Sequence, residues 1–148
     1  MKVVLIKEVF PVNEKEISSI LKNLDIEYTM KDKREIEDFE NQLVIVAEER
    51  DLDDNKEYIG YLNMKENKNL DCEYIIENLT VKEARRGLGI GSSMIKYAIK
   101  LSKEKGIKNL SCKTDKKEEY LNKFYEKLGF MRVNNNNEDG IIYINDLK

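Results

Sequence analysis

The stretch R-R-G-L-G-I-G-S-S-M-I-K-Y-A-I-K, residues 85–100, places three glycines in five positions and then continues with helical periodicity. A glycine inside a helix costs about 1 kcal/mol relative to alanine, so three glycines where a helix begins need a further explanation. Glycine lets the backbone approach a ligand closely, and the first turn of a helix presents unpaired N–H groups and a positive dipole end. The stretch therefore predicts an anion-binding turn, to which Arg85 or Arg86 adds a charge-assisted hydrogen bond.

Two common phosphate-binding motifs do not fit this stretch. A Walker loop needs the pattern G-x-x-x-x-G-K-S/T, and a dinucleotide-binding turn needs G-x-G-x-x-G with an acidic residue about 20 positions further on. Here Gly87-x-Gly89 is followed by Ser92, and the lysine of a Walker loop is missing. We therefore expect this turn to bind a pyrophosphate, but in neither of these two known arrangements. The alternative is a glycine turn that serves only the tight connection from strand to helix.

The hydrophobic pattern on either side predicts an α+β fold with a mixed, mostly antiparallel sheet of about seven strands flanked by about four helices. The expected strands cover residues 3–10, 43–48, 58–64, 72–81, 107–113, 130–133 and 141–144. The expected helices are 14–23 after an N-cap at Asn13, a weaker 32–40, a central one from Gly89 to Gly106, and a last one from Asp115 to Gly129. Residues 134–140 are expected to form a hairpin loop, and residues 1–148 a single domain.

The charges are unevenly placed, although the net charge of the 148 residues is only −3. Residues 1–80 contain 11 Lys and Arg against 20 Asp and Glu, whereas residues 81–148 contain 15 against 9. This distribution suits an anionic ligand on the C-terminal part and a cationic one on the N-terminal part, although solvated surfaces alone produce the same asymmetry. A nucleic-acid-binding role is not supported, because the chain is acidic overall and lacks a basic stripe interleaved with aromatic residues.

Several classes of protein are excluded by what the sequence lacks. No apolar run approaches the roughly 20 residues of a membrane helix, and Lys7 and Glu8 interrupt the first run, so we expect a cytoplasmic protein outside the membrane. The absence of histidine removes the commonest general base. Cys72 and Cys112 lie far apart, so we expect no metal site and no disulfide framework, and interpret both as small buried hydrophobic residues.

Three segments together resemble one family. V-K-E-A-R-R-G-L-G-I-G, residues 81–91, is similar to the acyl-CoA signature R/Q-x-x-G-x-G/A of the GNAT superfamily of N-acyltransferases. I-E-N-L-T-V, residues 76–81, is similar to the family's fourth strand, and F-Y-E-K-L-G-F, residues 124–130, to the end of its last helix. The resemblance covers about residues 74–130, and the expected order of strands before them agrees with the family fold.

The resemblance implies a binding site for acetyl-CoA. The backbone of the fourth strand would hydrogen-bond the pantetheine arm as if it were another strand, and the glycine turn would hold the pyrophosphate. The residues expected to contact the coenzyme are Leu79, Thr80, Val81, Arg86, Gly87, Leu88, Gly89, Ile90, Gly91 and Ser92. The chain departs from the family at Glu83, where proline is frequent, and at Glu118, where asparagine is frequent. Glu118 alternatively serves as a capping partner for Asp115.

The resemblance also implies two catalytic residues. An alkyl ammonium must lose a proton before it attacks a thioester, which costs about 4–5 kcal/mol at pH 7. Glu77, on the strand expected to face the thioester, is the candidate base, directly or through water. Its alternative roles are an ordinary charged strand residue or a contact for the amine. Tyr125 matches the family's general acid, whereas without the resemblance it is an aromatic residue on the apolar face of a helix.

The function implied is acetyl transfer from acetyl-CoA to a primary amine by direct attack in a ternary complex. Because the acceptor would enter from the acidic N-terminal part, we expect a small cationic molecule, such as a polyamine, an aminoglycoside-like amine, an amino acid or a peptide amine. Two alternatives stay open: acetylation of a protein N-terminus or lysine, and a non-catalytic module that senses acyl-CoA. Dimers are common in families of this kind, so a homodimer is also an expectation.

Overall fold

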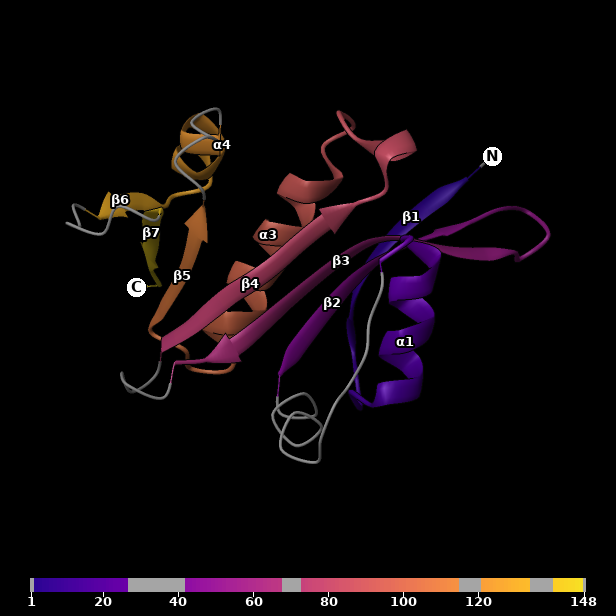
Figure 1. The fold of residues 1–148 in the computed structure, drawn as a ribbon, viewed down its shortest axis with the longest axis horizontal. Coiled ribbons are helices and arrows are strands. Elements are labelled where there is room, and N and C mark those ends of the chain that lie inside the picture. Colours follow the sequence, from indigo (N-terminus) through magenta and orange to yellow (C-terminus); the bar gives the residue numbers. More distant parts are fainter. Residues whose placement is uncertain (1, 27–41, 68–72, 115–120, 134–139, 148) are drawn as a thin grey trace.

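The computed structural model describes residues 2–26, 42–67, 73–114, 121–133 and 140–147, which form seven strands, three α-helices and one 3-10 turn (Figure 1). The strands are β1 (Val3–Val9), β2 (Leu43–Arg50), β3 (Lys56–Glu66), β4 (Glu73–Val81), β5 (Asn109–Thr114), β6 (Met131–Val133) and β7 (Ile141–Asp146). The helices are α1 (Glu14–Asn23), α3 (Ile90–Glu104) and α4 (Leu121–Lys127), and the 3-10 turn is η1 (Glu83–Arg85). The predicted helix over 32–40, the hairpin loop over 134–139 and the residues Cys72, Asp115 and Glu118 lie outside the described ranges.

The strands form one sheet in the order β1-β2-β3-β4-β5-β7-β6. All neighbours pair antiparallel except β4 and β5, which are parallel. The helix α3 connects these two strands, because parallel neighbours need a long crossover connection. The predicted α+β class with a mixed, mostly antiparallel sheet is therefore confirmed. No helix in the described ranges has the length and apolar character needed to cross a membrane.

Both faces of the central strands are covered, because successive side chains of a strand point to opposite faces. On β2, Val44 and Val46 pack in a cluster with the buried side of α1, whereas Ile45 and Ala47 pack in a second cluster with α3. Completely burying one such aliphatic side chain contributes about 1.5–3 kcal/mol. The two helices thus hold β2 and β3 from opposite sides and fix the position of β4, the next strand of the sheet.

The three α-helices end in the same way. A residue with positive φ follows the last turn, and the apolar residue after it donates its N–H to the carbonyl five positions back, which is the Schellman arrangement. The positive-φ residues are Asp25 (57°), Gly106 (77°) and Gly129 (90°). The closing hydrogen bonds run from Ile26 to Leu21 at 2.9 Å, from Ile107 to Ser102 at 2.9 Å and from Phe130 to Tyr125 at 3.0 Å.

These caps correct two predicted strand boundaries. The sequence predicts strands from Ile107 and from Phe130, but β5 begins at Asn109 and β6 at Met131. Ile107 and Phe130 are both buried, which explains their strand-like apolar character. Their N–H groups, however, serve the ends of α3 and α4, so they belong to the helix caps and not to the strands.

The two parallel strands share only part of their length. β4 pairs with β5 from Glu73 to Ile76, where the ladder ends, and residues 78–81 are paired on the β3 side alone. Figure 1 shows β4 and β5 meeting at one end and diverging toward their carboxyl ends, with α4 standing beyond the end of β5. A register shift opposite Asn63 and Met64 leaves Glu77 as an extra residue in β4, a bulge at the point of divergence.

Candidate active site

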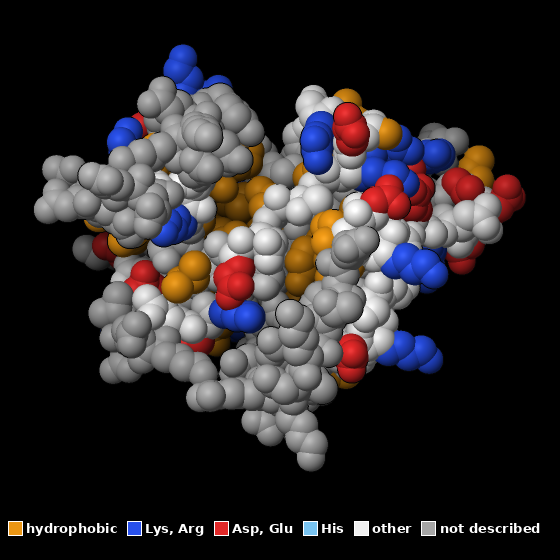
Figure 2. All heavy atoms as spheres, viewed as in Figure 1, with side chains coloured by type: hydrophobic (Ala, Val, Ile, Leu, Met, Phe, Trp, Pro, Cys, Tyr) orange, Lys and Arg blue, Asp and Glu red, His pale blue; other side chains and the backbone are white. Residues whose placement is uncertain are grey.

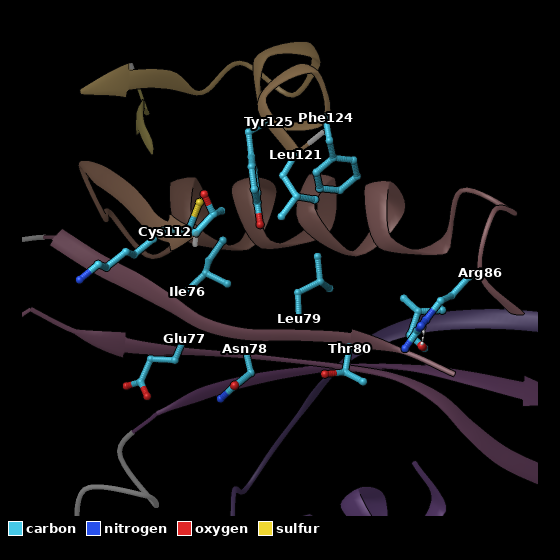
Figure 3. A pocket seen from close by; sticks show the side chains of 13 residues that line it. Ile76, Glu77, Asn78, Leu79, Thr80, Arg86, Cys112, Leu121, Phe124 and Tyr125 are labelled. Carbon is cyan, nitrogen blue, oxygen red and sulfur yellow. Dashed lines mark hydrogen bonds between the residues drawn. The ribbon is translucent and has the colours of Figure 1, made fainter. Parts of the chain in front are cut away.

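A cleft of about 650 Å³ opens where β4 and β5 diverge. Figure 2 shows the surface hollowed between the part that carries α4 and the part that carries η1, with hydrophobic side chains inside the hollow. In Figure 3, Leu121, Phe124 and Tyr125 reach down from α4 toward Ile76 and Leu79 of β4. The residues that line the cleft are Ile76, Glu77, Asn78, Leu79, Thr80, Val81, Arg86, Cys112, Lys113, Thr114, Leu121, Phe124 and Tyr125.

The free edge of β4 forms one wall of this cleft. Leu79, Thr80 and Val81 all line it, as the sequence predicts for coenzyme contacts. Their backbone groups that point away from β3 face no strand, because the β4–β5 ladder ends at Ile76, and the Val81 carbonyl accepts a hydrogen bond from Arg86 Nε instead. Unpaired backbone N–H and C=O groups favour an extended ligand that completes the hydrogen bonds of the strand.

The glycine turn lies at the end of that edge. Gly87 and Gly89 both have φ of 81°, a conformation that glycine adopts without strain, and Gly89 is the N-cap of α3. The first backbone hydrogen bond of α3 runs from Ser93 N–H to the Gly89 carbonyl at 3.0 Å, so the preceding N–H groups have no partner within the helix. These groups belong to Ile90, Gly91 and Ser92, three of the predicted coenzyme contacts.

The side chains of the turn leave its backbone accessible. An added Cβ at Gly87 or Gly89 would have no neighbour within 4 Å, so nothing covers the turn on that side among the described residues. Leu88, between them, is 70% exposed, whereas Ile90 is buried and starts the apolar face of α3. A backbone turn that is open, rich in glycine and at a helix N-terminus has the geometry of an anion site.

The two arginines of the turn have different partners. The Arg85 guanidinium binds the Glu49 carboxylate through two hydrogen bonds of 2.8 and 2.9 Å, and this contact lowers the pKa of Glu49 from 4.5 to about 2. Arg86 instead lines the cleft, is exposed, and donates from Nε to the Val81 carbonyl at 3.0 Å. Of the two arginines that the sequence offers for an anion, Arg86 is therefore the one at the cleft, whereas Arg85 anchors η1 to β2.

Tyr125 is held in an aromatic cluster. Its ring meets the rings of Phe124 and Phe130 edge to face, with centroids 5.1 and 5.6 Å apart, and lies 5.1 Å from the ring of Tyr143. Figure 3 shows its hydroxyl pointing into the cleft. There it faces the buried Cys112 thiol, whose pKa burial raises to about 12 although a hydrogen bond from Tyr125 lowers it. The burial of Cys112 agrees with its interpretation as a small core residue.

Glu77 lies on the other side of β4. Figure 3 shows its carboxylate, like the side chains of Asn78 and Thr80, directed away from Tyr125. The carboxylate forms an ion pair with Lys65 on β3, at 3.5 Å, and both side chains are more than a third exposed. The structure therefore brings Glu77 and Tyr125 to one cleft but from opposite sides of β4, with the open strand edge between them.

A groove between α3 and α4 is a surface that the sequence does not predict. It has a volume of about 420 Å³ and is lined by Ser92, Lys96, Lys123, Phe124, Lys127 and Leu128. It contains three lysines and begins next to the glycine turn, so it offers positive charge to a ligand that leaves the turn in this direction. The i, i+4 spacing of Lys123 and Lys127 places them on one face of α4, but only the folded chain brings Lys96 of α3 to the same groove.

Comparison with known proteins agrees with this geometry. A sequence model of the acetyltransferase (GNAT) family matches residues 14–130, which is most of the chain. The chain belongs to the acetyltransferase (GNAT) family. This GNAT protein is therefore an acyltransferase by family, and the resemblance found around the glycine turn is confirmed. A search of curated protein sequences finds no significant match.

Solved structures share the fold of this GNAT protein. An acetyltransferase of the GNAT family from Staphylococcus aureus Mu50 is 17% identical with a TM-score of 0.69, over 99% of this chain and 100% of that one. The PaiA N-acetyltransferase from Thermoplasma acidophilum, in complex with coenzyme A, is 15% identical with a TM-score of 0.67, over 97% and 99%. A chain of the NatC complex bound to Gag peptide and CoA is 20% identical with a TM-score of 0.69, over 98% and 99%. At these identities the likeness is one of fold.

Proposed function

We propose that this GNAT protein transfers an acetyl group from acetyl-CoA to a primary amine of a small cationic molecule. The observation that carries the proposal is the cleft between β4 and β5, which the open edge of β4, the Tyr125 hydroxyl and Arg86, the residue before the glycine turn, all line. Family membership and the coenzyme A in a structural relative support acyl-CoA as the donor. The acetyl group and the amine are the specific parts of the proposal.

The residues present fit a bound acyl-CoA. The free edge of β4 at Leu79 and Val81 would pair with the amide groups of the pantetheine arm, as an added strand does. The N–H groups of residues 86–92 and the Arg86 guanidinium would hold the pyrophosphate, which suits a helix N-terminus. The lysines of the groove between α3 and α4 would then lie near the remaining phosphate of the coenzyme. The thioester would reach the cleft at the level of Tyr125.

In the proposed reaction, the acceptor arrives as an ammonium and loses one proton to Glu77, directly or through water. This deprotonation costs about 4–5 kcal/mol at pH 7 for an ordinary alkyl ammonium. The neutral amine then attacks the thioester carbonyl, so that a C–N bond forms and the C–S bond breaks; the nitrogen releases its second proton to solvent, from which the Tyr125 hydroxyl is protonated again. Glu77 is exposed and stands beside Lys65, which suits both a base in contact with solvent and a carboxylate that binds the cation.

Tyr125 would supply the proton that the leaving thiolate needs. General acid catalysis of this kind contributes about 10²- to 10⁴-fold. The aromatic cluster around Tyr125 supports the assignment, because it fixes the ring and leaves the hydroxyl as the group that faces the cleft. The same packing would be found around a core tyrosine, so the substitution Tyr125→Phe is the direct test.

The experiment follows free-thiol release from acetyl-CoA with spermidine, tobramycin, L-lysine and a peptide with a free N-terminus. Tyr125→Phe is compared with Tyr97→Phe, a half-buried tyrosine of α3 outside the cleft. We expect release with a small amine, a drop of at least about tenfold in kcat for Tyr125→Phe, and an unchanged Kd for acetyl-CoA in both variants. Tyr97→Phe should retain wild-type kcat.

The other outcomes identify the alternatives. Release with the peptide alone would point to acetylation of protein termini or lysines. A thermal shift on addition of acetyl-CoA, with no release for any amine, would favour a module that senses acyl-CoA. Equal kcat for Tyr125→Phe and the wild type would remove Tyr125 from the mechanism while leaving the transferase function in place.

A further inference from the structure

Three amide side chains form a row across the sheet on the side of β4 to which Glu77 points. Asn78 Nδ2 donates to Asn63 Oδ1 at 2.9 Å, and Asn63 Nδ2 donates to Gln42 Oε1 at 2.7 Å. Gln42 and Asn63 are only 3% and 4% exposed, whereas Asn78 is exposed and lines the cleft. The row therefore leads from a buried anchor to the candidate active site.

The row has a direction. As the three amides are oriented in the structure, both hydrogen bonds donate away from the cleft, so the amide of Asn78 uses its NH₂ group inside the row and the buried Gln42 Nε2 has no partner among the described residues. No described residue donates to Asn78 Oδ1, which is left as the acceptor on the exposed end. An amide has separate donor and acceptor ends, so holding the donor end fixes where the carbonyl oxygen points.

The bulge in β4 brings this oxygen to the same side as Glu77. Consecutive strand residues normally point to opposite faces, but Asn63 pairs with Asn78 and Met64 with Ile76, which leaves Glu77 as the extra residue. Figure 3 shows the side chains of Glu77 and Asn78 both directed away from α4. Two neighbouring residues thus present acceptor oxygens to one region beside the open strand edge, namely Asn78 Oδ1 and the Glu77 carboxylate that pairs with Lys65.

We propose that Asn78 binds the acceptor amine through Oδ1, and that Asn63 and Gln42 are positioning residues that keep this oxygen turned toward it. The proposal rests on the proposed acetyl transfer and adds a second residue to the acceptor site. A primary ammonium has three N–H donors, so it can bind Asn78 Oδ1 while another N–H faces Glu77. A secondary ammonium has two N–H donors and can also make both contacts, whereas a tertiary ammonium has one and cannot, so the pair disfavours tertiary amines.

The test measures kcat and both KM values for Asn78→Ala, Asn78→Asp and Asn23→Ala. Each variant is assayed with the amine that gives the highest kcat/KM with the wild type, among those tested for the proposed function. Asn78→Ala should raise the KM for the amine at least about tenfold, the effect of losing a hydrogen bond to a charged group, and leave the KM for acetyl-CoA within twofold. Asn78→Asp keeps an acceptor oxygen but loses the donor to Asn63 Oδ1, so its KM for the amine should lie between that of the wild type and that of Asn78→Ala. Asn23→Ala, at the end of α1, should match the wild type.

The outcomes separate this inference from the proposed function. If the wild type transfers acetyl groups but Asn78→Ala leaves the KM for the amine unchanged, the role of Asn78 is wrong and the transferase function stands. If Asn78→Asp raises the KM for the amine as much as Asn78→Ala does, the NH₂ group of Asn78 faces the cleft, and the proposed orientation of the amide is wrong. If the wild type transfers to no amine, both proposals fail together.

The positioning role has its own test in Asn63. Asn63→Leu removes the acceptor for Asn78 Nδ2, so Asn78 can rotate, and the KM for the amine should rise severalfold with the KM for acetyl-CoA unchanged. Asn63→Asp restores an acceptor and should recover most of the loss. A lower Tm for Asn63→Leu with a wild-type KM for the amine would show that the row only stabilises the sheet, and would overturn the positioning role.

Discussion

The two halves of β4 belong to one strand but have different surroundings. Residues 74–76 pair with β3 on one side and β5 on the other, whereas residues 78–81 pair with β3 alone and Glu77 is the bulged residue between them. The first half includes the buried Glu73 and Ile76, and the second half contains no buried residue. The closed half therefore contributes to the core, and the open half offers backbone groups to a ligand.

The difference shows that the cleft arises because the β4–β5 ladder ends at Ile76, and that no additional helix or strand is needed to form it. The same backbone that forms a ladder in the closed half remains available in the open half, because β5 turns away and α4 follows it. We therefore expect substitutions around the closed half of β4 to lower the stability of the protein. Substitutions in the open half, or in the turn that follows it, should mainly weaken ligand binding.

The largest effect is expected in the closed half. Leu110 of β5 is completely buried and stands opposite Tyr74 in the parallel ladder. Leu110→Ala should lower the free energy of unfolding by about 2–5 kcal/mol, the usual cost of such a cavity, in urea titrations. Leu79→Ala in the open half should cost less stability but weaken acetyl-CoA binding measured by calorimetry. The reverse pattern would contradict the division of β4 into two roles.

The second prediction compares the two arginines after the open half. The folded pKa of Glu49 is depressed to about 2, so its pairing with Arg85 stabilises the protein above pH 4.5 and is lost as the pH falls from about 4.5 toward 2. Arg85→Gln should lower the Tm at pH 7 by about 2–4 °C and flatten the acid-unfolding curve in that window. Arg86→Gln should leave this curve unchanged and weaken acetyl-CoA binding. Equal binding losses in both variants would mean that Arg85 also serves the ligand.

The third prediction uses the two ends of α3. Gly89 and Gly106 have φ of 81° and 77°, and an added Cβ would meet nothing within 4 Å at either position. Gly89→Ala and Gly106→Ala should therefore lose similar stability, about 1–2 kcal/mol from the left-handed backbone, in thermal unfolding. Only Gly89→Ala should also weaken acetyl-CoA binding. If Gly106→Ala also weakened acetyl-CoA binding, the loss in Gly89→Ala would be due to a less stable α3 and not to a lost contact with the ligand.

The smallest effect is expected in the groove between α3 and α4. Lys123→Gln should raise the Kd for acetyl-CoA by about two- to fivefold at low salt, and less at high salt, because exposed charges are screened. Lys100→Gln, an exposed lysine of α3 that does not line the groove, is the control. Binding of dephospho-CoA, which lacks one phosphate, should respond less to Lys123→Gln. If Lys123→Gln weakens the binding of dephospho-CoA and acetyl-CoA equally, the phosphate that dephospho-CoA lacks does not lie in this groove.

Much of the fold follows from local patterns in the sequence. The alternation along β2, the cap at Asn13 and the apolar stripe of α3 each depend on neighbouring residues, so their prediction needs no knowledge of the rest of the chain. The glycine turn is equally local. The early strand starts predicted at Ile107 and Phe130 were wrong, because a helix cap and a strand both favour a buried apolar residue there.

The parts of the site that the sequence did not reveal depend on distant residues. Arg85 and Arg86 are adjacent and identical in type, and it is the pairing of Arg85 with Glu49, 36 positions away, that removes Arg85 from the cleft. The amide row joins Gln42, Asn63 and Asn78 across 21 and 15 positions, with no pattern in the sequence that links them. The bulge that turns Glu77 and Asn78 to one side appears only when the register of β3 and β4 is known.

Cys112 has a consequence for side reactions in the cleft. Its thiol lies beside the Tyr125 hydroxyl, close to where the thioester would react, and a thiolate there would compete with the amine by taking the acetyl group itself. Burial raises the pKa of the Cys112 thiol to about 12, so the thiol stays protonated at pH 7. If acyl-CoA binds as proposed, the burial of this one sulfur atom would protect the protein from acylating itself.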